Sequence, residues 1–317
     1  MSIYNRKIPS KIQIEKVAVI GAGLMGHGIA LEIAASGYHV NLYDVTETIL
    51  DTAKQNINYG LQKLVDSGKV KADQVSSAKS RIKTSNNLAD QLRDVDLVIE
   101  AAPENLSMKQ ELFKNFGELC PSHTILASNT SSFMPSLYAD QSKRPDKVLV
   151  IHYANPPHLV PLVEIVRSDK TSDATLNTAK EFIEGIGKNV IVVNREIEGF
   201  ILNRLQIALL RESLWLVENG ITDVEGIDKA IKYCTGRRWA FAGIFEVFEL
   251  AGWDTIEKIY REVAPTLASK PDIPVPLKRL IDKGLFGSKS GQGFYKSDKN
   301  WTDSVKTRIA KGLASFK

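Results

Sequence analysis

The stretch KVAVIGAGLMGHGIALEIAASGYHVNLYD, residues 16–44, decides the fold expected for the first half of the chain. It opens with a short run of β-branched residues at 16–20, and a GxGxxG pattern follows at 21–26 and leads into a helical pattern. A second strand pattern covers residues 39–44. A glycine turn placed between a strand and a helix predicts a dinucleotide-binding βαβ unit.

Each glycine of this turn has its own physical reason. Gly21 allows a tight turn, Gly23 lets the backbone approach a pyrophosphate, and Gly26 lets the helix pack closely on the strand. The N-terminus of the following helix presents N–H groups and a positive dipole end to phosphates. We include Leu24 and Met25 of the same turn among the expected cofactor contacts.

Asp44 selects the cofactor. It ends the second strand 23 residues after Gly21, close to the usual spacing of about 20. A carboxylate there binds the ribose 2′-hydroxyl of NAD and repels the 2′-phosphate of NADP, and no arginine follows it directly. A flavin needs further covering segments, which we do not see. The alternative is an ordinary βαβ turn with a solvated Asp44; NAD is the stronger interpretation.

The rest of the chain divides into two patterns. Helical segments alternate with short apolar strand patterns at 96–102, 124–129, 148–153, 161–166 and about 189–193, and one long polar helical region is expected over 46–83. This alternation predicts a Rossmann-like α/β fold, a doubly wound and mostly parallel sheet covered on both faces. Helical periodicity without strands follows it, so an all-helical C-terminal domain is expected.

We expect three parts. They are an N-terminal arm (1–14), an NAD-binding domain (15–196) and a helical domain for substrate binding and dimerisation (197–317). The segment WAFAGIFEVFELAGW (239–253) is too apolar for the core of one small domain, which predicts a homodimer.

Composition excludes several classes of function. The 317 residues carry a net charge of +4 without a dense basic block, which argues against nucleic-acid binding. No segment has the roughly 18 apolar residues of a membrane helix, and the N-terminus has no secretory pattern. The two cysteines, Cys120 and Cys234, are far apart and are expected as thiols in a reducing cytoplasm.

A second motif, VIHYANPPHLVPLVE (150–164), carries the expected chemistry. Oxidation of an alcohol with NAD requires a base, and histidine with a carboxylate on its far nitrogen suits both directions near neutral pH. His152 ends a strand at the edge where such folds bind ligands, and a reversal at 155–157 would bring Glu164 of the next strand beside it. His158, in a loop between prolines, is the weaker base, and a metal site built from these three residues is the less favoured alternative.

The chain resembles the 3-hydroxyacyl-CoA dehydrogenase family over nearly its whole length. The matching segments are GAGLMGHGIA, VIEAAPENLSMKQELF, TILASNTSS, HYANPPHLVPLVEIV, EGFILNRL and FGSKSGQGFYK. The resemblance implies that His152 and Glu164 transfer the proton and that Ser131 and Asn203 contact the substrate. It implies cofactor contacts from Asp44, Glu104, Lys109, Ser131, Asn155 and Lys289, and it implies no catalytic metal.

Several of these residues also have ordinary structural interpretations. Ser131 is a common turn residue, and Asn203 can be a surface residue of its helix. Glu104 and Lys109 can be first-turn helix charges, and Lys289 can be a solvated loop residue.

The substrate class is divided between two branches. Acyl-CoA members read HFFNPVP and PGF where this chain has HYANPPH and EGF, and Gly236–Glu246 carries Arg237 and Arg238 in place of a glycine/proline-rich approach. These features resemble the branch of L-gulonate dehydrogenase (lambda-crystallin) and L-carnitine dehydrogenase, whose substrates are free hydroxy acids; a bidentate arginine suits a free carboxylate. The lysine-bearing helical arm (46–83) supports an acyl-CoA, which we favour.

A different class of function is a non-catalytic NAD-binding or structural protein, as lambda-crystallin relatives illustrate. All the expected catalytic side chains are present, which argues against this class.

Overall fold

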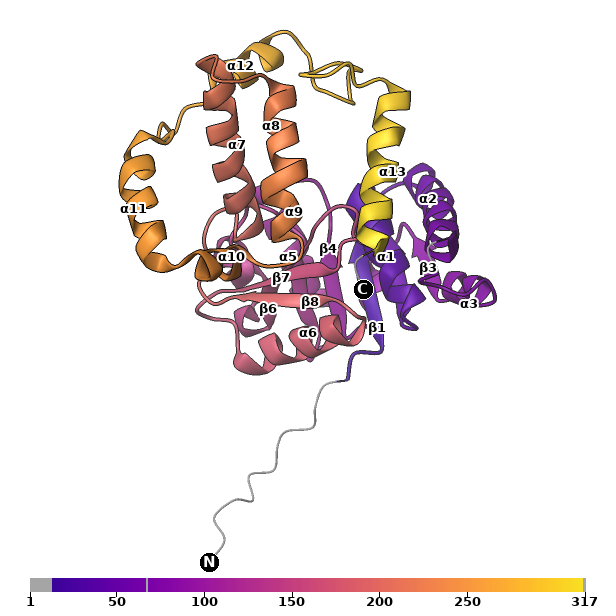
Figure 1. Cartoon of the computed structure of the whole chain (residues 1–317). Coiled ribbons are helices and arrows are strands. Elements are labelled where there is room, and N and C mark those ends of the chain that lie inside the picture. The colour runs from indigo at the N-terminus through magenta and orange to yellow at the C-terminus, as the bar shows by residue number, and fades with distance from the viewer. Residues whose placement is uncertain (1–12, 67, 316–317) are drawn as a thin grey trace, which may run out of the picture. The chain divides into compact units, whose positions relative to one another are not determined.

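A computed structural model of the protein describes residues 13–66 and 68–315 (Figure 1). The expected N-terminal arm falls almost wholly outside the described residues, which begin at residue 13. The described chain forms two compact units that divide between Leu202 and Asn203 and again between Gly312 and Leu313.

The first unit is built on one eight-stranded sheet in the order β3-β2-β1-β4-β5-β6-β7-β8. All neighbouring pairs are parallel except β6 and β7, which are antiparallel. The strands are β1 (Lys16–Ile20), β2 (His39–Tyr43), β3 (Ile82–Ser85), β4 (Leu97–Glu100), β5 (Ile125–Ser128), β6 (Val148–Tyr153), β7 (Leu162–Arg167) and β8 (Asn189–Val193). The mostly parallel, Rossmann-like sheet expected from the sequence is confirmed.

Helices connect these strands and cover the sheet (Figure 1). They are α1 (Leu24–Ala35), α2 (Glu47–Asp66), α3 (Gln74–Ser80), α4 (Leu88–Leu92), α5 (Leu106–Leu119), the short 3₁₀ turns η1 (Pro135–Leu137), η2 (Ala139–Ser142) and η3 (Pro145–Lys147), and α6 (Asp173–Gly185). The Asn105 side chain caps α5 by accepting a hydrogen bond from the Met108 amide. Phe113 and Phe116 of that helix are fully buried in the core with Tyr138.

The prediction of one long helical region over 46–83 is wrong. The helix α2 ends at Asp66, Gly68 adopts a positive φ of 72°, α3 follows, and the strand β3 begins at Ile82. This strand has only four residues, of which Lys83 is exposed, so it has no strong apolar pattern of its own. Parallel pairing with β2 at the edge of the sheet stabilises it, and that long-range contact has no local sequence signal.

The second unit is helical, as expected, and is formed by α7 (Leu202–Glu218), α8 (Val224–Ala230), the π-helical turn η4 (Ile231–Thr235), α9 (Gly236–Trp239), α10 (Ile244–Ala251), α11 (Trp253–Val263), the 3₁₀ turn η5 (Ala264–Thr266), α12 (Val275–Asp282) and α13 (Lys299–Ser315). Isolated β-bridges join Gly287 to Gln292 and Gln292 to Lys296. Among the described residues of this unit, Leu214 is the single fully buried apolar side chain. No helix of the described residues is long and apolar enough to cross a membrane.

Candidate active site

In the glycine turn there is no room for a side chain at Gly21 or Gly26, whereas the space beside Gly23 is open. Gly21 has a φ of 105°, and a Cβ atom on it would lie 2.6 Å from the Ala101 carbonyl oxygen. A Cβ on Gly26 would lie 1.7 Å from the Gly21 carbonyl oxygen, so both positions require glycine. A Cβ on Gly23 would have no described heavy atom within 4 Å. The open space at Gly23 is where a pyrophosphate is expected to approach the backbone.

The first turn of α1 is suited to bind an anion. Gly23 occupies the N-cap position, no described side chain caps the helix, and the first turn carries no acidic residue. Its N–H groups are therefore available to phosphate oxygens, and Leu24 and Met25 lie in this turn. The residues present fit the phosphates of a dinucleotide.

Asp44 lies beside the same turn. Its Oδ2 accepts a hydrogen bond from the Ala22 amide at 2.7 Å, and its Oδ1 accepts one from the Val45 amide at 2.7 Å. The carboxylate is half-buried and held at the end of β2, next to the glycine turn. This is the position expected for a ribose contact.

The predicted histidine–glutamate pair is formed across two strands. In the antiparallel register of β6 and β7, His152 lies directly opposite Glu164. The His152 Nδ1 and Glu164 Oε2 atoms are 2.6 Å apart, His152 is 5% exposed and Glu164 is fully buried. The expected reversal that brings them side by side is confirmed. Since Nδ1 is held by the carboxylate, Nε2 is the nitrogen left to exchange a proton with a substrate.

The second oxygen of Glu164 also accepts hydrogen bonds. Its Oε1 accepts hydrogen bonds from the amides of Ile201 and Leu202, both at 2.9 Å, at the point where α7 begins. The carboxylate therefore cannot rotate without losing either these amides or the imidazole.

Phe200 is a site residue that the sequence reasoning missed. It has a positive φ of 51°, is fully buried, and its ring packs edge-on against the His152 imidazole at a centroid distance of 5.7 Å. A non-glycine residue in the left-handed region beside a candidate base indicates that the site constrains the backbone. The signal available in the sequence was its position after Gly199 in the EGF segment.

His158 has a lowered pKa. Burial, with smaller contributions from His27 and two lysines, lowers the pKa of His158 to about 4. The imidazole is therefore neutral and nearly non-basic at neutral pH. Within residues 13–66 and 68–315, no three histidine, cysteine, aspartate or glutamate side chains are grouped so that they hold a metal ion.

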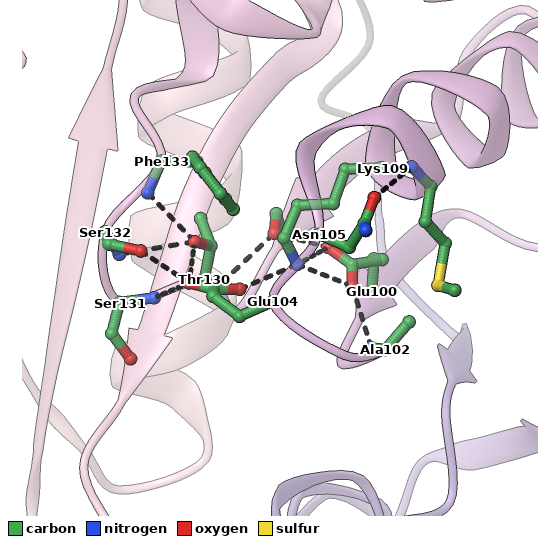
Figure 2. A network of polar contacts seen from close by, with 11 residues as sticks. Glu100, Ala102, Glu104, Asn105, Lys109, Thr130, Ser131, Ser132 and Phe133 are labelled. Carbon is green, nitrogen blue, oxygen red and sulfur yellow. Dashed lines mark hydrogen bonds and ion pairs between the residues drawn. The ribbon is translucent and has the colours of Figure 1, made fainter.

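Glu104 and Lys109 meet in a polar network that also contains the turn after β5 (Figure 2). The Glu104 Oε1 accepts hydrogen bonds from the Ser131 amide at 3.0 Å and from the Ser132 hydroxyl at 2.9 Å. Lys109 lies between Glu104 and a further carboxylate, Glu100, which the sequence reasoning did not single out. A charged residue inside the apolar strand DLVIEAA was the available signal.

The remaining predicted residues are more exposed. Asn155 follows β6 in the first unit and is exposed. The second unit holds four of the predicted residues: Asn203, half-buried in the first turn of α7, and the exposed Arg237, Arg238 and Lys289. Their contacts with groups of the first unit stay predictions.

Two family models match consecutive parts of the chain. A family model of the 3-hydroxyacyl-CoA dehydrogenase NAD binding domain matches residues 16–197, and a model of the 3-hydroxyacyl-CoA dehydrogenase C-terminal domain matches residues 199–297. The mitochondrial hydroxyacyl-coenzyme A dehydrogenase of Sus scrofa is 38% identical over 293 residues, which cover 90% of this chain and 92% of that protein.

Two solved structures are similar over most of the chain. A 5-formyl-3-hydroxy-2-methylpyridine 4-carboxylic acid 5-dehydrogenase, described as an NAD⁺-dependent dismutase, has a TM-score of 0.90 and 29% identity and covers 96% of this chain and 97% of its own. The (S)-3-hydroxybutyryl-CoA dehydrogenase of Ralstonia eutropha has a TM-score of 0.75 and 30% identity, with 90% and 100% covered.

The open space at Gly23 generates a first prediction. In Gly23→Ala the added methyl group meets no described atom, so the free protein is expected to keep its melting temperature within about 2 °C. NADH binding, measured by fluorescence titration, is expected to weaken at least about tenfold because the methyl group occupies the pyrophosphate position. Unchanged NADH affinity would contradict this placement. Gly26→Ala is the contrasting variant, since its clash with Gly21 destabilises the free protein itself.

Proposed function

Because the chain belongs to the 3-hydroxyacyl-CoA dehydrogenase family, NAD-dependent oxidoreductases that act on CH–OH groups, we propose that it oxidises a 3-hydroxyacyl-CoA reversibly to the 3-ketoacyl-CoA. A substrate such as 3-hydroxybutyryl-CoA fits this proposal. The observation that carries it is the buried His152–Glu164 pair at the end of β6. Because β1, β4, β5 and β6 are parallel, this end lies at the same edge of the sheet as the glycine turn.

In this proposal His152 is the general base. Its Nε2 takes the proton of the 3-hydroxyl group, and Glu164 keeps the proton on Nδ1 and stabilises the imidazolium that forms. NAD, when bound, supplies the hydride acceptor. In the reverse direction the imidazolium returns its proton to the carbonyl oxygen.

The supporting roles are also proposals. Ser131 and Asn203 position the substrate oxygens. The cofactor contacts, beside the glycine turn, are Asp44, Glu104, Lys109, Ser131, Asn155 and Lys289.

Removal of either partner of the pair is expected to abolish most turnover. His152→Gln removes the base, and Glu164→Gln removes the charge that stabilises the imidazolium, so each should lower kcat by roughly 10²–10⁴-fold. NADH affinity should stay nearly unchanged in both. The matched control is His158→Gln, which removes a histidine of the following loop and should leave kcat within about threefold. Turnover at the parent rate in His152→Gln would reject the assignment.

A free hydroxy acid is the second candidate substrate. The solved structure with a TM-score of 0.90 belongs to an enzyme named for a pyridine carboxylate, whereas the 3-hydroxybutyryl-CoA dehydrogenase of Ralstonia eutropha has a TM-score of 0.75. Arg237 and Arg238 are exposed residues of α9, and a guanidinium group binds a carboxylate in bidentate geometry.

One panel of NAD-linked assays separates the two candidates. We expect 3-hydroxybutyryl-CoA to give a kcat/KM at least about tenfold above L-gulonate, L-carnitine and free 3-hydroxybutyrate, because the acyl-CoA family match covers both units. If a free acid is preferred, Arg237→Met or Arg238→Met should then raise its KM by roughly tenfold or more. NADH formation with none of these substrates would favour a non-catalytic NAD-binding protein.

We also propose a homodimer formed through the segment 239–253. Its side chains Phe241, Phe245 and Leu250 are 80%, 75% and 87% exposed, while the unit that carries them has little buried apolar core of its own. A cytoplasmic location is retained in the proposal because Cys120 and Cys234 are both free thiols.

The dimer is tested by charge placed in this segment. Phe245→Asp together with Leu250→Asp should convert a dimer to a monomer in sedimentation velocity, because two carboxylates would have to be buried in the interface. Val45→Asp is the control, a change at a similarly exposed residue of the first unit, and should leave the dimer intact. A monomeric parent protein at micromolar concentration would reject the proposal.

A further inference from the structure

Lys109 is buried between two carboxylates. Its Nζ lies 2.9 Å and 3.0 Å from the two oxygens of Glu100 and 3.0 Å from Oε2 of Glu104, and its side chain is 1% exposed (Figure 2). An ammonium group has three protons to donate. These three carboxylate oxygens match that number.

Glu100, the first carboxylate beside Lys109, is held in place by burial and by further hydrogen bonds. It is fully buried at the end of β4 and also accepts hydrogen bonds from the Ala102 amide at 2.7 Å and the Ser128 hydroxyl at 2.5 Å. A buried carboxylate is tolerated when it is paired with a cation and its remaining lone pairs are satisfied. Glu100 meets both conditions, and these bonds hold the ends of β4 and β5 to the first turns of α5.

Glu104, the second carboxylate beside Lys109, is partly exposed. Its side chain is 41% exposed, and its Oε1 binds the turn after β5 through the Thr130 hydroxyl, the Ser131 amide and the Ser132 hydroxyl. The Thr130 hydroxyl oxygen in turn accepts hydrogen bonds from the amides of Ser132 and Phe133. Figure 2 shows the Ser131 side chain pointing away from the Glu104 carboxylate. The carboxylate therefore holds the backbone of Ser131 through its amide.

The charge of Lys109, together with the hydrogen bond from Thr130, favours the ionised form of Glu104. Burial raises the pKa of Glu104, but the hydrogen bond from Thr130 and the charge and hydrogen bond of Lys109 outweigh it, and the net pKa lies below the ordinary value. Without this cation two carboxylates would face each other, and like charges at that distance favour protonation or separation. Glu104 is the partner that would turn to solvent, because Glu100 is fully enclosed.

We propose that Glu100 and Lys109 are positioning residues: Lys109, anchored by Glu100, holds Glu104 on the turn Thr130–Phe133 and so orients Ser131. This inference rests on the proposed role of Ser131 and deepens it. It gives Lys109 an action through Glu104 beside the cofactor contact that the family resemblance implies, and it adds Glu100, which no motif had marked, to the positioning residues of the site.

The test removes both buried charges together. Glu100→Gln combined with Lys109→Met leaves no unpaired buried ion, so this double variant is expected to fold. Hydrogen exchange of a peptide spanning 128–133, followed by mass spectrometry of the full-length protein, reports the turn without any need for turnover. Exchange should become roughly tenfold faster in the double variant and in Glu104→Gln. Lys114→Met, a change at an exposed lysine of the same helix, should leave exchange unchanged.

Turnover provides the second readout, with acetoacetyl-CoA and NADH as the probes. In the double variant kcat at saturating NADH should fall roughly tenfold to a hundredfold through misplacement of Ser131. Adding Glu104→Gln should cause little further loss, since all three residues act through one contact.

The pH profile of ketone reduction carries its own expectation. Because Lys109 lowers the pKa of Glu104, the double variant should lose activity at a higher pH than the parent as the pH falls.

A turn that exchanges at the parent rate in the double variant would overturn the inference. If the double variant fails to fold, Glu104→Gln alone decides the test. Hydrogen exchange of residues 128–133 at the parent rate in that variant would reject the proposed role of Glu104. Absence of turnover in the parent would count against the proposed function only, since the exchange experiment stands without it.

Discussion

The site depends on one buried carboxylate, that of Glu164. One of its oxygens holds the His152 imidazole, and the other accepts the first amides of α7. A fully buried carboxylate is stable only when its lone pairs are satisfied, so the strand pairing, the imidazole and the helix start support one another. The antiparallel return of β7 along β6 makes this possible, because it places residues 152 and 164 opposite each other. A parallel neighbour would require a long crossover connection between these two strands.

The same principle recurs at the neighbouring strand ends. Glu100 is fully enclosed, and Lys109 neutralises it while also reaching Glu104. Buried ion pairs contribute little net stability, and their partners define geometry well because the loss of either is costly. The two carboxylate-centred clusters therefore fix a base on β6 and a turn after β5, while the glycine turn is left open for a dinucleotide.

The second unit differs from the first in how much apolar surface it exposes. Its helices are amphipathic, yet large apolar side chains such as Phe241, Phe245 and Leu250 remain exposed. Apolar surface on this scale in a small helical unit is typical of proteins that associate. The interface proposed for the segment 239–253 accounts for a composition that an isolated domain would not need.

Local signals in the sequence determined much of this protein. The glycine turn, Asp44, the alternation of strands and helices and the helical second half follow from patterns within about 30 residues, because each reflects local backbone and packing preferences. The pairing of His152 with Glu164 followed from a strand end, a proline reversal and the need for a base.

The tertiary structure decided what those patterns left open. The strand β3 is stabilised by its pairing with β2. Phe200 packs edge-on against the His152 imidazole, next to the two amides, Ile201 and Leu202, that bind the Glu164 carboxylate. Glu100 and Lys109 are joined in one cluster with Glu104 and Ser131 only when β4, α5 and the turn after β5 come together. Each of these depends on contacts between segments far apart in the chain, whose energies no local window of sequence contains.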